Sequence, residues 1–143
     1  MVLELTGVFP APRDRVYEAL TTPEDLARWW GPHGFTVPEI QWDLRVRGSY
    51  RMTMQPPEGD AFHLRGEFSA VDPPAAVAYT FVWEPPNPDD RETEVRLSLT
   101  DREGSTELHL RQGVFATEER LALHRGGWSD SFEKLERLLD PSR

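Results

Sequence analysis

Alternation of apolar and polar side chains dominates the middle of the chain and most constrains its fold. Five runs place an apolar residue at every second position with polar residues between them, although the third run is also fairly apolar on its other face. These runs cover residues 50–54, 62–69, 77–83, 94–99 and 106–110. A period of two with one polar face is typical of antiparallel strands. The short connectors are rich in turn residues and predict hairpins, while the longer, proline-rich connector 84–90 is predicted to be extended and water-facing.

Helical periodicity appears on both sides of this predicted sheet. Residues 2–9 are predicted to form a first strand, followed by two short helices over about 11–20 and 22–30. Pro12 suits the first turn of the first helix, because its missing N–H would be unpaired there in any case. A long helix is predicted from about residue 117 to 139, with a length of ~34 Å at ~1.5 Å per residue. Its apolar stripe consists of Leu121, Trp128, Phe132, Leu135 and Leu139.

This order of elements predicts a single α+β domain that spans residues 1–143. We expect a helix-grip fold, in which a curved antiparallel sheet of about six to seven strands wraps around the long C-terminal helix. One helix cannot cover both faces of a sheet of this size, so the sheet must bend around the helix. If the sheet curls more tightly at one end than the helix can fill, an apolar cavity remains beneath the two short helices.

The charge balance argues against two classes of partner. The chain carries 25 acidic and 16 basic residues, which gives a formal net charge of −9. Such a surface repels phosphate backbones and anionic lipids, so neither nucleic acid nor a membrane is an expected partner. The chain has no cysteine, which excludes disulfides, thiol nucleophiles and cysteine-ligated zinc. The absence of a ~20-residue apolar run and of a signal-peptide pattern favours a cytoplasmic location.

Several short motifs follow one another in a familiar order. Residues 12–32 have the pattern Pro-x-x-x-Val-Tyr-x-Ala-Leu-Thr-x-Pro-Glu-x-Leu-x-x-Trp-Trp-Gly-Pro. Gly-Phe-Thr-Val follows at 34–37, Asp-Leu-Arg-Val-Arg-Gly-Ser-Tyr at 43–50, and Gly-Gly-Trp at 126–128. From about Leu5 to Leu139 the chain resembles the START/polyketide-cyclase-like superfamily, and more narrowly it is similar to the heat-shock-protein-90 ATPase activator homologue family. Arg47 departs from the pattern, because this family usually has the first of two glycines there.

The resemblance implies a helix-grip fold with a ligand cavity between the sheet and the long helix. It does not imply one activity, because members of the superfamily bind lipids, sterols, hormones or polyketides, and a few catalyse cyclisation or dehydration.

Inward side chains of the sheet and the helices supply the candidate ligand-binding residues. Strand parity points them toward the helix, where most would form ordinary core and some would form a cavity wall. Trp29 and Trp30 either both pack in the core or expose one ring at the cavity mouth. Met52 and Met54 suit an adaptable apolar surface. The candidate ligand-binding residues are Trp29, Trp30, His33, Phe35, Tyr50, Met52, Phe62, Leu64, Phe68, Tyr79, Phe81, Trp83, Trp128 and Phe132.

Few polar residues are candidates for chemistry. His33 could act as an acid or base near the cavity mouth, or it could be an ordinary solvated loop histidine. Asp43 and Arg45 could pair across the cavity floor, or they could form a structural turn or a surface ion pair. Tyr50 and Tyr79 could offer a hydroxyl to a polar end of a ligand. No two histidines have i, i+4 ligand spacing, so neither a metal site nor a cofactor is predicted, and catalytic residues stay unassigned.

A pair of glycines interrupts the long helix. Gly126 and Gly127 each cost ~1 kcal/mol there relative to alanine. Either the glycines allow the helix to pack closely on the sheet, or they leave room for a ligand beside Trp128.

Three functions follow from these observations. The first is the binding of a small apolar or amphipathic molecule in the cavity. The second is an enzyme of the cyclase or dehydratase kind, in which His33, Asp43 or Tyr79 would move protons on a polyketide-like substrate. The third is a chaperone-interaction module, for which the acidic surface permits contact with a basic partner patch. The sequence also leaves a homodimer open.

Overall fold

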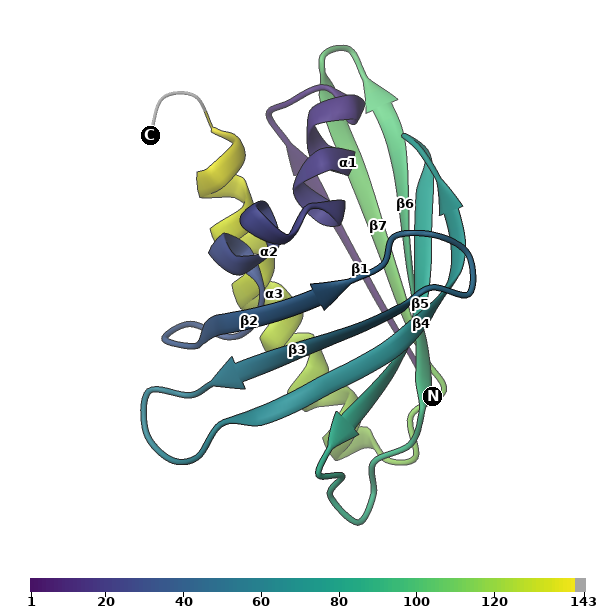
Figure 1. Cartoon of the computed structure of the whole chain (residues 1–143). Coiled ribbons are helices and arrows are strands. Elements are labelled where there is room, and N and C mark those ends of the chain that lie inside the picture. The colour runs from purple at the N-terminus through teal and green to yellow at the C-terminus, as the bar shows by residue number, and fades with distance from the viewer. Residues whose placement is uncertain (141–143) are drawn as a thin grey trace.

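In the computed structural model, which describes residues 1–140, a seven-stranded sheet bends around one long helix while two short helices close one end (Figure 1). The last three positions of the predicted domain therefore lie outside the described residues. The helices are α1 (Arg13–Thr21), α2 (Pro23–Trp29) and α3 (Glu118–Leu139). The strands are β1 (Val2–Phe9), β2 (Thr36–Trp42), β3 (Ser49–Gln55), β4 (Phe62–Asp72), β5 (Ala76–Glu84), β6 (Thr93–Arg102) and β7 (Ser105–Gly113). The predicted helix-grip fold, with two short helices after the first strand, is confirmed.

The sheet has the order β1-β7-β6-β5-β4-β3-β2, and every neighbouring pair is antiparallel. Consecutive strands from β2 to β7 are therefore direct neighbours, as the short connectors predict. In Figure 1, β2 and β3 lie across the view while β6 and β7 lie close to vertical, so the sheet bends strongly between its two edges. Helix α3 lies across the concave side of this bend.

Strand β2 is the element that the alternation of side chains does not show. It lies at the edge of the sheet, and its register against β3 shifts between Thr36 and Glu39. Pro38 occupies this shift and cannot donate a hydrogen bond to a neighbouring strand. An irregular edge strand exposes parts of both faces, so its residues lack the clean period of two that the central strands have.

Helix α3 begins where its capping residues predict. The Thr117 hydroxyl accepts a hydrogen bond from the Arg120 N–H at 3.1 Å, and Glu118 and Glu119 occupy the first turn. A capping oxygen and early acidic residues both stabilise a helix N-terminus. Pro12, by contrast, caps α1 from just outside and does not lie in its first turn.

An aromatic cluster fills the sheet beneath α1 and α2. The ring centroids of Trp42 and Phe68 lie 4.9 Å apart, and those of Tyr50 and Tyr79 lie 5.3 Å apart. The Trp42 indole N–H donates to the Thr21 carbonyl at 3.0 Å and so ties this cluster to α1. Packed aromatic rings bury large areas, so this half of the sheet holds solid core.

The turn before β3 holds Arg47 in a backbone conformation that usually requires glycine. Arg47 has a φ of 70°, in the left-handed region that glycine adopts freely and that costs other residues ~1–2 kcal/mol. Its N–H still donates to the Phe68 carbonyl at 2.8 Å, so the turn forms despite the missing glycine. The departure of Arg47 from the family pattern is therefore a local strain and leaves the fold intact.

Gly66 lets two strands and an aromatic ring meet. It pairs with Tyr50 across β3 and β4, and the Tyr50 hydroxyl donates to the Thr80 carbonyl at 2.6 Å. A Cβ at position 66 would lie 2.6 Å from the Tyr50 ring and would overlap the Thr80 carbonyl oxygen. Any side chain there must therefore displace backbone.

We expect Gly66→Ala to lower the free energy of unfolding by about 2 kcal/mol, because overpacked positions typically cost that much. Urea denaturation measures this change. Gly126→Ala is the control, because a Cβ at that helical position would meet nothing within 4 Å. The control should raise stability by about 1 kcal/mol, and equal effects of the two substitutions would contradict the assignment.

Candidate functional site

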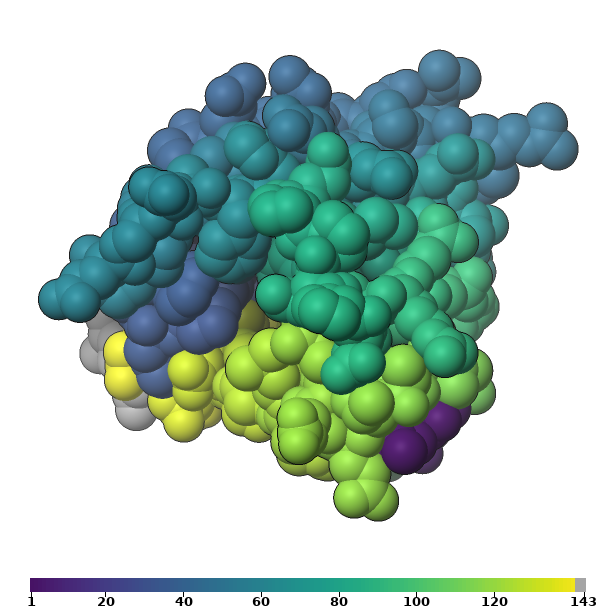
Figure 2. Space-filling model, turned by 90° about the horizontal axis from the view of Figure 1, so that it is seen from below, coloured from purple at the N-terminus to yellow at the C-terminus, as the bar shows by residue number. Residues whose placement is uncertain are grey.

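A cavity of about 380 Å³ lies between α3, the segment after α2 and one end of strands β3 to β5. Seen from below in Figure 2, the surface is hollowed where the blue segment after α2, the teal strands and the yellow-green helix α3 meet. The cavity is lined by Trp30, Gly31, Pro32, Phe35, Met54, Phe62, Phe81, Trp83, Pro85, Asn87, Arg120, Leu123, His124, Gly127, Trp128 and Ser131. A mostly apolar wall and a volume of this size are typical of small-molecule sites.

Part of the predicted candidate set lies on this wall. The candidates that line it are Trp30, Phe35, Phe62, Phe81, Trp83 and Trp128. The candidates that lie elsewhere are Trp29, His33, Tyr50, Met52, Leu64, Phe68, Tyr79 and Phe132. Strand β5 shows the reason, because Phe81 and Trp83 reach the cavity while Tyr79, two residues earlier, lies in the solid core. Parity determines which face of the sheet a side chain takes, and its position along the strand determines whether it meets core or cavity.

The candidates outside the cavity have identifiable partners. Trp29 is fully buried and donates its indole N–H to the Ala19 carbonyl at 2.8 Å. Phe132 packs edge-on against Phe9 on β1, with ring centroids 5.5 Å apart. Burial raises the pKa of the Tyr79 hydroxyl far above its ordinary value, so this group stays protonated and has no use as a base.

Two alternatives from the sequence are resolved by the packing. Arg45 Nε lies 2.9 Å from Asp43 Oδ2, and the two side chains are 74% and 50% exposed. They form the surface ion pair, and a pair on the cavity floor is wrong. Gly126 has open space where a side chain would be, so close packing on the sheet does not explain it. Gly127 lines the cavity, where a Cβ would approach only Pro32, at 3.7 Å.

Two tryptophans separate the solid core from the cavity. The ring centroids of Trp30 and Trp128 lie 5.2 Å apart, edge to face, and both rings line the cavity. The Trp128 indole N–H donates to Gln112 Oε1 at 2.8 Å, and the Gln112 amide donates in turn to Thr93 Oγ1 at 2.9 Å. Since Gln112 is completely buried, this chain of hydrogen bonds fixes the Trp128 ring against β6 and β7.

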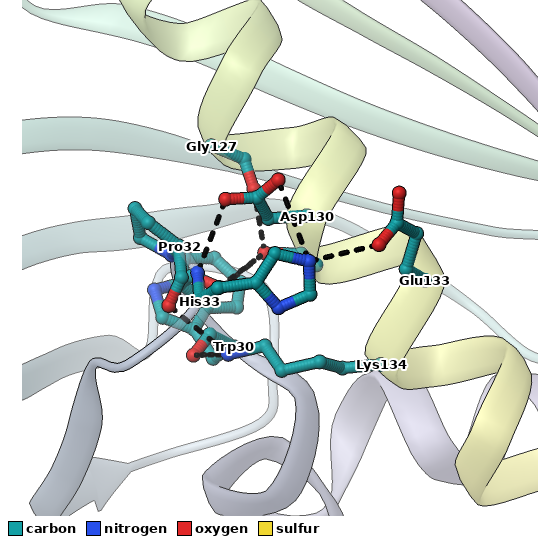
Figure 3. A network of polar contacts seen from close by, with 9 residues as sticks. Trp30, Pro32, His33, Gly127, Asp130, Glu133 and Lys134 are labelled. Atoms are coloured by element: carbon teal, nitrogen blue, oxygen red, sulfur yellow. Dashed lines mark hydrogen bonds and ion pairs between the residues drawn. The ribbon is translucent and has the colours of Figure 1, made fainter.

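The segment after α2 is hydrogen-bonded to α3, which holds this side of the cavity in place. The Gly31 N–H donates to Ser131 Oγ at 3.0 Å, and the Ser131 hydroxyl lies within 3.2 Å of the Gly31 carbonyl. Lys134 Nζ donates to the Trp30 and Pro32 carbonyls at 3.2 and 3.3 Å. Figure 3 shows Lys134 reaching back from the helix to these carbonyls. Cavity-lining residues of this segment are thus held by side chains of the helix.

His33 takes part in the same attachment from the outside. Its backbone N–H donates to Asp130 Oδ2 at 3.1 Å, and its Nε2 lies 2.8 Å from Glu133 Oε2 (Figure 3). The side chain is 43% exposed and does not line the cavity. His33 is therefore neither an acid–base group at the cavity nor a free loop histidine, because it joins the segment after α2 to α3.

The sequence analysis missed His124, the buried histidine of the cavity wall. Its side chain accepts a hydrogen bond at Nε2 from the Trp83 indole N–H at 3.2 Å, and the residue is only 8% exposed. The rings of Phe115 and Phe81 lie 4.9 and 5.2 Å from the imidazole. A signal was present, because position 124 is three residues after Leu121 and four before Trp128, on the apolar stripe of α3.

An apolar environment keeps His124 neutral. Burial lowers its pKa to about 4, and the charge of Arg120 acts in the same direction against a smaller opposing effect of Asp90. Arg120 Nη2 and Asp90 Oδ1 lie 2.6 Å apart, with side chains only 17% and 6% exposed. The predicted water-facing loop 84–90 is therefore exposed over much of its length, but Asp90 turns inward to pair with α3.

Within residues 1–140, no group of three or more His, Cys, Asp or Glu side chains could hold a metal ion. Over the same residues, no helix has the length and apolarity that crossing a membrane requires.

We expect His124 to make stability depend on pH below neutrality. Its folded pKa of about 4 lies below the ordinary value of 6.5, so between these values the unfolded chain binds a proton that the folded chain does not. Stability from this group is complete above pH ~6.5 and is lost as the pH falls toward 4, by about 2 kcal/mol between pH 7 and pH 5. Urea denaturation at pH 7 and pH 5 measures this loss of stability in the wild type and in His124→Phe. The variant should lack the part of the loss that comes from His124. A His124 imidazole that titrates near 6.5 by NMR would rule this out.

We expect Ser131→Ala to loosen the segment after α2. The substitution leaves the buried Gly31 N–H without its acceptor, which typically costs about 1–2 kcal/mol. Hydrogen exchange should show faster exchange of the Gly31 amide, by about tenfold. Ser129→Ala, on the same helix, serves as the control and should leave this amide unchanged. Equal protection in both variants would show that Ser131 does not hold the segment.

Comparison with known proteins places the chain among proteins of the same fold. A protein from Chromobacterium violaceum shares 25% identity with a TM-score of 0.90, covering 98% of this chain and 97% of that one. The AHSA1 protein from Silicibacter pomeroyi shares 27% identity with a TM-score of 0.84, covering 97% of both chains. A Rhodobacter sphaeroides protein shares 26% identity with a TM-score of 0.82, covering 96% of this chain and 91% of that one.

The curated proteins contain no match to this chain. The family described as Activator of Hsp90 ATPase homolog 1-like protein matches residues 10–140. This match covers nearly the whole chain, and the chain belongs to that family.

Proposed function

We propose that this protein binds a small apolar or amphipathic molecule in the cavity between the sheet and α3. The observation that supports the proposal is the apolar, aromatic-lined space of about 380 Å³ beside Trp30 and Trp128. Burial of a ligand there would remove its apolar surface from water at ~25 cal/mol per Å². The hydrogen bonds from Ser131 and Lys134 hold one wall in place, so little ordering of the protein would oppose binding.

A cyclase or dehydratase is less well supported. Such an enzyme needs an ionisable group beside the substrate. None of the three residues that the sequence suggests for this role, His33, Asp43 and Tyr79, lines the cavity. His124 lines it, but its pKa of about 4 makes it a poor base at neutral pH, and the Arg120 guanidinium is held in an ion pair. Contact with a chaperone and formation of a homodimer remain predictions.

The cavity itself can be tested by two substitutions on adjacent residues of α3. A leucine at position 127 would enter the cavity beside Pro32, whereas a leucine at position 126 would extend into open space. Both substitutions replace a helical glycine, so both should stabilise the helix. We expect Gly127→Leu to weaken binding of the probe 2-ethylnaphthalene at least about tenfold, or ~1.4 kcal/mol, and Gly126→Leu to leave it unchanged.

Ligand-detected NMR measures these affinities, and urea denaturation confirms that both variants fold. If the wild type binds neither this probe nor its ketone analogue 2-acetylnaphthalene, or if the two variants bind the probe equally, the proposed function is wrong.

A further inference from the structure

Several hydrogen-bonding groups on one side of the cavity wall are already occupied. Ser131 Oγ accepts from the Gly31 N–H and lies 3.2 and 3.0 Å from the Gly31 and Gly127 carbonyls. Lys134 Nζ donates hydrogen bonds to the Trp30 and Pro32 carbonyls. The segment after α2 therefore offers a ligand few free acceptors.

His124 differs from these groups, because one of its ring nitrogens is available. The indole N–H of Trp83 can only donate, so the His124 Nε2 that accepts it carries no proton. The proton of the neutral ring is therefore on Nδ1, which has no hydrogen-bond partner among the described residues. Within residues 1–140, the fully buried side-chain nitrogens without a hydrogen-bond partner are Arg13 Nε and Arg120 Nε. Nδ1 is not one of these atoms, so it is not fully buried.

His124 lines the large cavity. A second hollow that His124 lines has a volume of about 10 Å³. That is at the lower limit of what one water molecule needs, so it holds no ligand.

The charges beside His124 cancel each other. Arg120 lines the cavity, but its guanidinium is paired with Asp90 at 2.6 Å, and its Nε is fully buried. An anionic ligand would therefore enter an apolar space without a net positive charge to compensate its desolvation. The net charge of −9 on the chain opposes an anion further.

From this arrangement we infer that the cavity takes a neutral, largely apolar ligand with a hydrogen-bond acceptor such as a ketone or ester carbonyl, which receives the Nδ1–H of His124. The inference rests on the proposed binding function and specifies its ligand class. Aromatic rings on several sides of the space suit a flat ring system. A volume of about 380 Å³ holds roughly a dozen groups the size of a water molecule, at ~30 Å³ each.

Three probes of similar shape test this inference at pH 7. These are 2-acetylnaphthalene with a carbonyl, 2-ethylnaphthalene without an acceptor, and 2-naphthoate with a negative charge. We expect the ketone to bind about 3- to 10-fold more tightly than the hydrocarbon, as one net hydrogen bond allows, and the anion to bind most weakly. The His124→Phe variant should bind the ketone and the hydrocarbon equally. His124→Gln should keep the preference, because an amide can accept from Trp83 and still donate to the carbonyl.

A measurement on the wild type covers the case in which a variant does not fold. The ¹⁵N chemical shift of His124 Nδ1 should change on binding of the ketone and stay nearly constant with the hydrocarbon. Tighter binding of 2-naphthoate than of the ketone would overturn the inference, as would a preference that survives in His124→Phe. Equal wild-type affinities for the ketone and the hydrocarbon would overturn it while leaving the binding function intact. If none of the three probes binds, both proposals are wrong.

Discussion

A single helix has to cover the concave face of a seven-stranded sheet, and this mismatch in width determines the rest of the structure. Where α1 and α2 add their side chains, the aromatic cluster around Trp42, Phe68 and Tyr79 fills the space completely. Beyond the Trp30–Trp128 contact, only α3 and the segment after α2 face the sheet, and the cavity remains. The solid core and the cavity thus both result from this mismatch in width, and the Trp30 and Trp128 rings separate them.

The sequence predicts the strands and the long helix well, but it predicts only partly which inward side chains form core and which line the cavity. A period of two identifies the central strands and a period of three to four identifies α3, because both depend on which side of an element is buried. The edge strand β2, with Pro38 at its bulge, has no such pattern. Parity also places Tyr79 and Phe81 on the same face without distinguishing core from cavity, because that difference depends on how far α2 reaches along the sheet. For Gly127 the sequence does not distinguish close packing from ligand space, because the difference depends on the distance to Pro32.

The polar groups near the cavity show two ways to place such groups in an apolar environment. Arg120 keeps its charge, because Asp90 turns inward from the β5–β6 loop and pairs with it. His124 gives up its charge, because three aromatic rings replace water around it and Trp83 donates to its lone pair. Histidine often serves as a metal ligand or a catalytic base, but a pKa near 4 makes His124 a poor proton acceptor at neutral pH. His124 can still donate a hydrogen bond from its Nδ1–H.

Glycine at position 127 is informative because a larger residue would fit there. A Cβ at this position would meet only Pro32, at van der Waals distance, and most residues would stabilise the helix by up to about 1 kcal/mol. The chain therefore keeps open a volume that it could fill at a gain in stability. The opposite wall is held by Ser131, Lys134 and His33, so the space does not depend on a movement of the segment after α2. A preformed cavity of this kind gains affinity mainly from apolar burial, and one directed hydrogen bond then decides between ligands of equal shape.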